Sequence, residues 1–160
     1  MDNLSRRAAL VGIAAFAASA KTAAAASNPV SDYTRTAGGL TVYLGVVPAE
    51  IIRGHPSAHP ERKMHGGPPR GPHQYHVIAA IFDAASGTRI SDATVMAKIS
   101  GLGLSGPETT LEPMKIADTT TYGTFVYLPG TDLYTITLTI QRPGSMQPVV
   151  LDFKYDHRRE

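Results

Sequence analysis

The sequence predicts an all-β protein, an antiparallel β-sandwich of about seven short strands. Apolar and polar residues alternate in a series of short segments, as in strands with one face in a core. Turn-forming residues, 15 Gly and 12 Pro among 160 residues, separate these segments. No segment after residue 26 shows a helical period over about ten residues. The length fits one domain, and 42% hydrophobic residues can supply its core.

Residues 1–26 have the pattern of a signal peptide of the twin-arginine type. Arg6 and Arg7 precede an apolar run, Ala8 to Ala20, that is too short to span a bilayer comfortably. We expect cleavage near Ala26, and an uncleaved amphipathic helix is the alternative. The mature chain is then periplasmic and has no membrane span, with a linker at 27–38 and a sandwich at 39–157.

Composition excludes several classes of function. The chain has no Cys, which excludes disulfides, thiolate metal sites and cysteine catalysis. The formal net charge of +2 gives no basic surface for nucleic acid. Gly101, Gly103 and Gly106 match a dinucleotide fingerprint in spacing, but Pro107 follows them where that site needs a helix. No catalytic motif is present, and we predict that the protein is not an enzyme.

The strands are predicted from period-2 alternation and from the turns between them. The clearest is 134–140, in which Tyr, Ile, Leu and Ile alternate with three Thr. The predicted strands are 40–46, 75–81, 95–99, 110–116, 122–128, 134–140 and 149–155. The predicted turns are Ser86-Gly87, Gly106-Pro107, Pro129-Gly130 and Pro143-Gly144.

One motif indicates which kind of sandwich this is. Asp132-x-Tyr134 is similar to the tyrosine corner of immunoglobulin-like sandwiches, in which the Tyr hydroxyl bonds to the backbone of a nearby loop. A half-buried Tyr packed across strands is the alternative. We therefore predict an immunoglobulin-like sandwich.

Residues 53–72 break the strand pattern and contain five Pro and four Gly. We expect a flexible loop that captures metal or covers a metal site, since long loops of this kind often carry function. Histidine and methionine are concentrated in and beside it, as in exported copper-binding segments. The candidate metal ligands here are His55, His59, Met64, His65, His73 and His76. The alternative is a solvated loop whose histidines are incidental.

His73 and His76 are the candidates that a strand can hold rigidly. Their spacing places them on opposite faces of that strand, so we do not expect them to chelate as a pair unless a bulge intervenes.

Residues 39–157 resemble periplasmic iron-transport accessory proteins that bind copper and have an immunoglobulin-like fold. YtkA-like secreted domains share several of the motifs and are a second similar family. The resemblance rests on short motifs in the same order along the chain. These are Gly39-Leu-Thr-Val-Tyr-Leu, His76-Val-Ile-Ala-Ala-Ile, Leu111-Glu-Pro-Met114, Tyr122-Gly123, Pro129-Gly130 with Tyr134-Thr-Ile, and Asp156-His157.

The resemblance implies a metal site, which this sequence matches at three of five positions. His76, Met114 and His157 stand where that family has two His and a Met. Ile78 replaces an expected Glu, and Thr121 replaces an expected His before Tyr122. A set of two His and one Met suits Cu(I), and His73 or His65 could add a fourth ligand. Core filling by Met114, a hydrogen-bonded His76 and a solvated His157 are the alternatives.

We therefore predict a periplasmic transition-metal-binding protein that handles metal or assists iron or copper transport. Copper is the expected ion and iron the second choice. The expected partners are the metal ion, an inner-membrane metal permease and a second copy of the chain in a homodimer. The alternative function is a metal-free interaction or scaffolding module of the cell envelope, which binds through strand edges or the Pro-rich loop.

Overall fold

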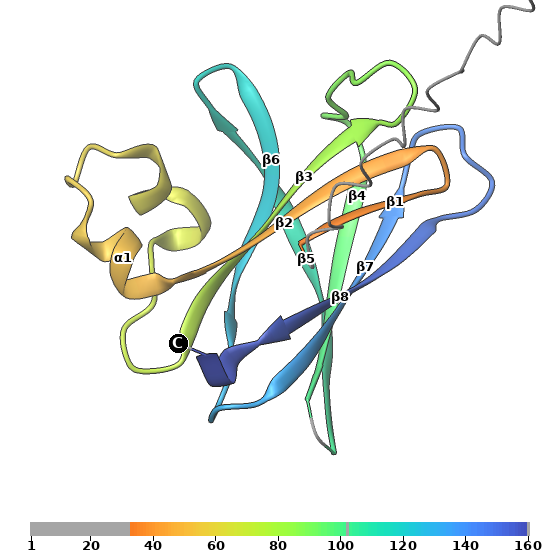
Figure 1. The fold of residues 1–160 in the computed structure, drawn as a ribbon. Coiled ribbons are helices and arrows are strands. Elements are labelled where there is room, and N and C mark those ends of the chain that lie inside the picture. Colours follow the sequence, from red (N-terminus) through yellow and green to blue (C-terminus); the bar gives the residue numbers. More distant parts are fainter. Residues whose placement is uncertain (1–32, 102, 160) are drawn as a thin grey trace, which may run out of the picture.

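The computed structural model describes residues 33–101 and 103–159, and the predicted signal peptide lies outside this range. Within these residues the chain forms eight antiparallel strands, one short helix and three 3₁₀ turns (Figure 1). The strands are β1 (Thr34–Ala37), β2 (Leu40–Pro48), β3 (Gln74–Asp83), β4 (Thr94–Gly101), β5 (Leu104–Ile116), β6 (Thr119–Tyr127), β7 (Leu133–Gln141) and β8 (Val149–Asp156). The other elements are α1 (Ala49–Gly54), η1 (Pro60–Arg62), η2 (Met64–Gly66) and η3 (His157–Arg159).

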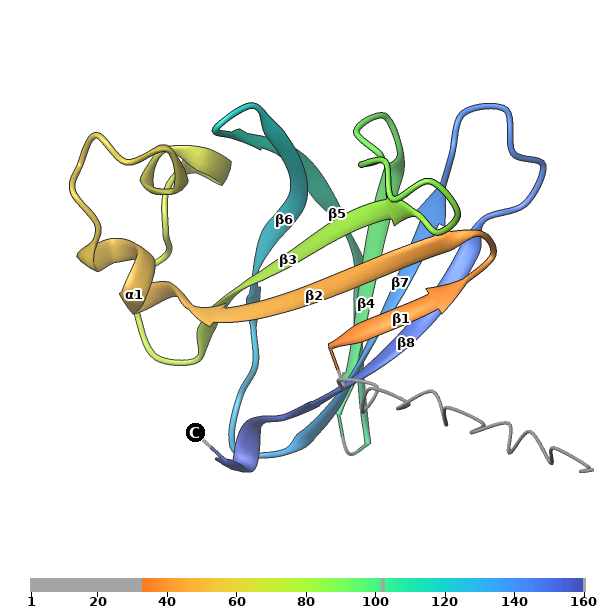
Figure 2. The same ribbon diagram turned by 45° about the horizontal axis from the view of Figure 1, so that its top comes forward.

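The strands are hydrogen-bonded in the continuous order β1-β2-β3-β6-β5-β4-β7-β8. They fold into two sheets that share β5. The first half of β5, up to Leu111, pairs with β4, and the second half, from Glu112, pairs with β6. β2 and β3 cross over β4 and β7 (Figure 2). At the open side Arg35 Nε of β1 donates to the Asp152 carbonyl of β8 at 3.2 Å, so the sandwich is nearly closed. The predicted all-β antiparallel sandwich is confirmed.

The core lies between the two sheets and follows the predicted alternation. On β3 the buried residues are Tyr75, Val77, Ala79 and Ile81, and on β7 they are Tyr134, Ile136, Leu138 and Ile140. Each large aliphatic side chain removed from water in this way stabilises the fold by about 1.5–3 kcal/mol. Since neighbouring residues of a strand point to opposite faces, His76 of β3 points away from this core.

The tyrosine corner is present as predicted. Tyr134 is buried, and its hydroxyl donates a hydrogen bond to the carbonyl of Pro129, five residues earlier. This bond ties the loop between β6 and β7 to the start of β7.

The structure has an additional strand, β1, in the segment where we expected a linker. Its residues Thr34 to Ala37 carry no apolar alternation, which is why the pattern did not reveal it. β1 turns directly into β2 through Gly38 and Gly39, whose φ angles are 57° and 74°. Two consecutive residues with positive φ are typical of a tight hairpin turn.

The predicted turn at Gly106-Pro107 is wrong, because both residues lie inside β5. The chain turns earlier, next to Gly103, whose φ is 74°. Between the pairs Lys98↔Glu108 and Ser100↔Ser105, two residues of β5 oppose one residue of β4. A bulge of this kind accommodates a proline, which has no N–H for the ladder.

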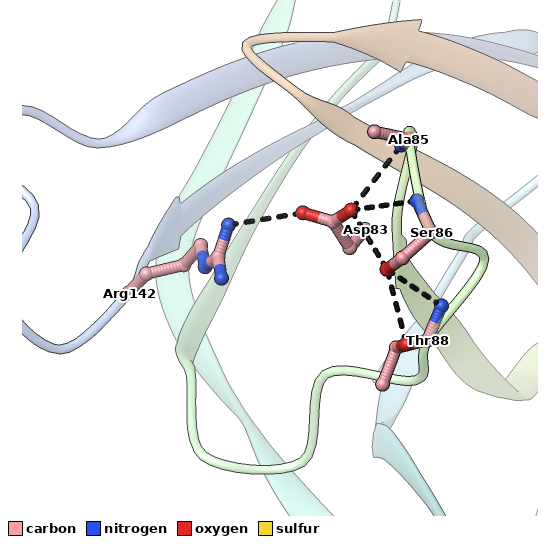
Figure 3. Close-up of polar contacts among 5 residues, drawn as sticks. All are labelled: Asp83, Ala85, Ser86, Thr88 and Arg142. Carbon is pink, nitrogen blue, oxygen red and sulfur yellow. Dashed lines mark hydrogen bonds and ion pairs between the residues drawn. The ribbon is translucent and has the colours of Figure 1, made fainter.

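The end of β3 is fixed by Asp83 (Figure 3). One carboxylate oxygen accepts hydrogen bonds from the backbone N–H of Ser86 at 2.9 Å and of Ala85 at 3.2 Å, and from the Ser86 hydroxyl at 2.9 Å. The other oxygen lies 3.6 Å from Arg142, which follows β7. The hydrogen bonds from Ser86, above all, lower the pKa of Asp83. The ion pair between Asp83 and Arg142 attaches this end of β3 to the opposite sheet.

Residues 49–72, called the lobe below, connect β2 to β3 and contain α1, η1 and η2. The lobe is the yellow segment beside one end of β2 and β3 in Figures 1 and 2. Ile52 is buried, the Arg53 guanidinium donates to the Pro69 carbonyl, and Arg62 Nη1 donates to the His55 carbonyl at 2.9 Å. Two short 3₁₀ turns, η1 and η2, thus lie within the segment predicted as a Pro/Gly-rich loop.

Candidate metal centre

His76 lies on the outer face of β3 and is nevertheless fully buried, with 0% exposure. Phe125, its partner on β6, stacks on the imidazole with ring centroids 4.6 Å apart. Neither ring nitrogen has a hydrogen-bond partner within residues 33–101 and 103–159. Burial, and secondly the charge of His65, lower the pKa of His76 to about 4. The imidazole is therefore neutral at neutral pH, with a free lone pair.

Met114 approaches His76 from β5, on the other side of β6. The register places Thr121, Gly123 and Phe125 on one face of β6, with Met114 opposite Thr121 and His76 opposite Phe125. Gly123 thus lies between the two side chains. Met114 is 2% exposed but does not belong to the core between the sheets. Met114 is therefore buried on the outer face of the sheet, and filling of the core between the sheets does not explain why a methionine stands here.

Gly123 leaves space that His76 and Met114 share. A Cβ added to Gly123 would lie 2.8 Å from Nε2 of His76 and 3.1 Å from Sδ of Met114. The two donor atoms therefore face one small volume, and any side chain at position 123 would fill it. A buried nitrogen and a thioether sulfur directed at the same space form a soft pair of ligands.

His65 enters this site from the lobe. It sits in η2 with a φ of 54°, and its ring centroid is 5.4 Å from that of His76. Its Nδ1 is 2.8 Å from Oε2 of Glu112, which lies two residues before Met114 on β5. The carboxylate can only accept, so Nδ1 carries a proton, and Nε2 is the atom left to bind an ion. This Nε2 is buried and has no partner in the described part of the chain.

These four residues form an arrangement that is common at metal sites. The imidazoles of His65 and His76 and the thioether of Met114 can each offer a lone pair, and the Glu112 carboxylate orients the His65 imidazole through Nδ1. Imidazole binds several borderline metals, whereas thioether favours Cu(I). Glu112 is 64% exposed and its carboxylate accepts a hydrogen bond from His65, so Glu112 orients this ligand and is not itself a ligand. We refer to His65, His76, Glu112 and Met114 as the outer-face site.

The structure does not bring His157 and His73 to the outer-face site. His157 Nε2 is 2.5 Å from the hydroxyl of Tyr75, whose side chain is on the core face of β3. Tyr155 stacks on the His157 ring at 5.7 Å, and the ring of His73 is 6.5 Å away. The side chains of Tyr75 and His76 point to opposite faces, so His157 is on the other side of the sheet.

The remaining candidates lie in the lobe. His55 and His59 meet Glu61 in a group of their own, whose ligand atoms all lie within 4.8 Å of one another. Met64 precedes His65 in η2 and is partly exposed. Of the six candidates in and beside the lobe, only His65 and His76 are thus part of the outer-face site.

Sequence reasoning missed two residues that shape the outer-face site, Glu112 and Gly123. Glu112 belongs to the motif Leu111-Glu-Pro-Met114, and its spacing of two from Met114 on a predicted strand already places both on one face. Gly123 belongs to the Tyr122-Gly123 motif, but its role depends on the pairing of β3, β6 and β5. The spacing was a usable signal for Glu112, and no comparable signal existed for Gly123.

Among the described residues, no helix is long and apolar enough to cross a membrane.

Comparison with known proteins identifies the fold. No family model matches the chain, and no curated protein matches it significantly. Solved structures do match. A copper-bound variant of FetP from uropathogenic Escherichia coli strain F11, with glutamine in place of a glutamate, has a TM-score of 0.57 at 17% identity. The match covers 77% of this chain and 92% of that one. FetP as isolated has a TM-score of 0.53 at 17% identity, covering 77% and 91%.

A DUF4426 family protein from Pseudomonas aeruginosa PAO1 matches with a TM-score of 0.53 at 13% identity, covering 77% of this chain and 94% of that one. The resemblance expected from the sequence motifs is thus confirmed at the level of the fold, since FetP is among the matching structures. The chain has the FetP-like immunoglobulin-type β-sandwich fold.

Proposed function

We propose that the protein is a periplasmic copper-binding protein that holds Cu(I) at the outer-face site. His65 and His76 each contribute Nε2, and Met114 contributes its thioether sulfur. Glu112 orients His65 through Nδ1. The function is binding for metal handling or delivery, without turnover.

The observation that carries the proposal is the convergence of unpaired donors. Nε2 of His65 and Nε2 of His76 are both buried without a partner in the described residues, and Nε2 of His76 shares the space above Gly123 with Met114. Leaving a buried polar nitrogen unpaired costs about 1–3 kcal/mol. A bound metal ion removes this cost by accepting both lone pairs.

The fold likeness supports the choice of metal. One matching FetP structure is described as copper-bound. This chain has Ile78 and Thr121 at two positions where the family resemblance expects ligands, and His65 of the lobe supplies an imidazole in their place. A set with two imidazoles and a thioether favours copper over iron, because iron prefers harder donor atoms.

Location and partners are part of the proposal. The signal-peptide pattern of residues 1–26 supports export to the periplasm by the twin-arginine route. An inner-membrane iron or copper permease is the proposed partner for delivery, and a homodimer is the proposed assembly.

The test is Cu(I) competition against a chromophoric chelator, with the chain purified without a histidine tag. Met114→Leu removes the sulfur at nearly constant volume. We expect at least about a tenfold weaker Cu(I) affinity for this variant and for His65→Ala. His73→Asn is the matched control, because Asn tolerates the φ of 60° found at His73. Unchanged affinity in both site variants would contradict the proposal, and a wild-type chain that binds no copper would favour the metal-free module.

A further inference from the structure

A second group of potential metal ligands lies in the lobe, apart from the outer-face site. Nδ1 of His55 is 3.3 Å from Nδ1 of His59 and 3.4 Å from Oε2 of Glu61. Nδ1 of His59 is 4.0 Å from the same carboxylate oxygen. Three ligand atoms from a segment of seven residues, 55–61, thus face one another.

The sequence itself accounts for this local geometry. Each of the two histidines precedes a proline, Pro56 or Pro60, and a residue before proline is restricted to extended conformations. His55 accordingly has φ/ψ of −64°/154°, and His59 has −62°/134°. The chain turns between them, with the His59 N–H donating to the Pro56 carbonyl at 2.9 Å. The two imidazoles are thereby brought to the same side, with ring centroids 4.4 Å apart.

Further hydrogen bonds hold the carboxylate side of the group. Pro60 opens η1 and places Glu61 in its first turn. The Arg62 N–H donates to the His59 carbonyl at 3.1 Å, and Arg62 Nη1 donates to the His55 carbonyl at 2.9 Å. The backbone around all three ligands is therefore fixed before any ion binds.

The spacing fits a tetrahedral ion. With metal–nitrogen bonds of about 2.0–2.1 Å, two ligand atoms of a tetrahedral site are about 3.3–3.4 Å apart. The His55–His59 and His55–Glu61 separations of 3.3 and 3.4 Å match this edge, and the third, 4.0 Å, closes after a small shift of the His59 or Glu61 side chain. The side chains are 34%, 37% and 22% exposed, so water can take the fourth position.

We propose that His55, His59 and Glu61 form a second metal site, for a borderline divalent cation such as Zn²⁺. Two imidazoles and a carboxylate with one open position are a typical zinc ligand set. The group has no thioether, so its preference differs from that of the outer-face site. The proposal stands independently of copper binding at His65, His76 and Met114.

The test uses Co²⁺ as a spectroscopic substitute for Zn²⁺, with the chain free of a histidine tag. We expect one equivalent of Co²⁺ to give the intense visible absorption of four-coordinate Co²⁺, and Zn²⁺ to displace it. In the double variant His55→Ala/His59→Ala, the Co²⁺ affinity should fall by more than about 100-fold. This exceeds the loss typical when only a residue hydrogen-bonded to a metal ligand is removed. Glu61→Gln should weaken it less.

Two controls separate this site from the others. His73→Asn should leave the Co²⁺ spectrum unchanged, because His73 lies outside the group. Met114→Leu should also leave it unchanged, whereas the His55/His59 double variant should retain its Cu(I) affinity. A Co²⁺ spectrum and affinity unaltered by the double variant would overturn the proposal, and so would octahedral Co²⁺ in the wild type. Neither result would affect the copper proposal.

Discussion

Nδ1 of His65 lies 2.8 Å from the carboxylate of Glu112, which is 47 residues further along the chain. This contact joins the lobe to β5 beside Met114 and leaves Nε2 of His65 as the free donor atom. The carboxylate is 64% exposed, so its contribution to folding stability is small and its main effect is on the imidazole.

Replacing Glu112 by Gln should therefore weaken copper binding more than folding. We expect the Cu(I) affinity to fall by about 10–100-fold, as is typical when the partner of a metal-bound imidazole is removed. The free energy of unfolding should change by less than about 1 kcal/mol. Chelator competition and urea unfolding measure the two effects. Glu108→Gln, on the same strand and also exposed, is the control. Equal affinities of the two variants would argue against this role of Glu112.

Gly123→Ala should abolish copper binding although it removes no donor atom. The new methyl group would lie 2.6 Å from Cε of Met114 and 2.8 Å from Nε2 of His76, in the space assigned to the ion. Chelator competition measures the loss, and circular dichroism checks that the sheet is retained. Gly45→Ala is the matched control on β2, since its methyl group would meet Ile78 at an ordinary 3.8 Å. Copper binding by Gly123→Ala at wild-type affinity would place the ion elsewhere.

Folding stability should fall as the pH is lowered from 6.5 to 4. The pKa of His76 is about 4 in the folded chain, against the ordinary histidine value of 6.5 that applies once the chain unfolds. In this window the unfolded chain binds a proton that the folded chain does not, so acid favours unfolding. The free energy of unfolding that depends on a neutral His76 is fully present above pH 6.5 and is lost as the pH falls to 4. The loss amounts to at most about 3 kcal/mol.

Urea unfolding of the metal-free chain at pH 7.5 and pH 4.5 measures this effect. His76→Leu has no titrating group at that position and should lose less stability between the two pH values than the wild type. His65 and Glu112 are the other titratable groups at the site, and both remain in the variant. The same loss in both chains would show that His76 titrates normally.

Tyr134→Phe should destabilise the sandwich without affecting copper binding. The variant loses the hydrogen bond from the hydroxyl to the Pro129 carbonyl, which is worth about 0.5–1.5 kcal/mol. Thermal unfolding measures the change. Tyr43→Phe, at a half-exposed position of β2, should have little effect. A melting temperature equal to that of the wild type would mean that the corner does not contribute to stability.

Most of the sandwich could be predicted from the sequence, because burial on one face imposes a period of two. The strand predicted at 134–140 is β7, Leu133–Gln141, and the one predicted at 75–81 is β3, Gln74–Asp83. β1 could not be found in this way, since a short polar edge strand has no apolar face. The extension of β5 was hidden by Pro107, which the bulge tolerates.

The site was harder to predict than the fold, because its ligands meet through strand register and through the lobe. His76 and Met114 converge because β6 lies between their strands. Its glycine, Gly123, stands between the two side chains and leaves space for them to meet. The position of His65 depends on a positive φ in η2, which no periodicity encodes. His157 was placed with them by resemblance, whereas its hydrogen bond to Tyr75 belongs to the other face of β3.

The lobe supplies one of the three proposed copper ligands, whereas the paired strands supply the other two. Copper bound by His65 would therefore hold the lobe against the sheet and oppose its local opening. Arg62 ends η1 and Lys63 lies between η1 and η2, so both bonds become better trypsin substrates when the lobe opens. Resistance to trypsin at these two bonds should thus rise with copper loading, which makes limited proteolysis a readout of whether the ion is bound.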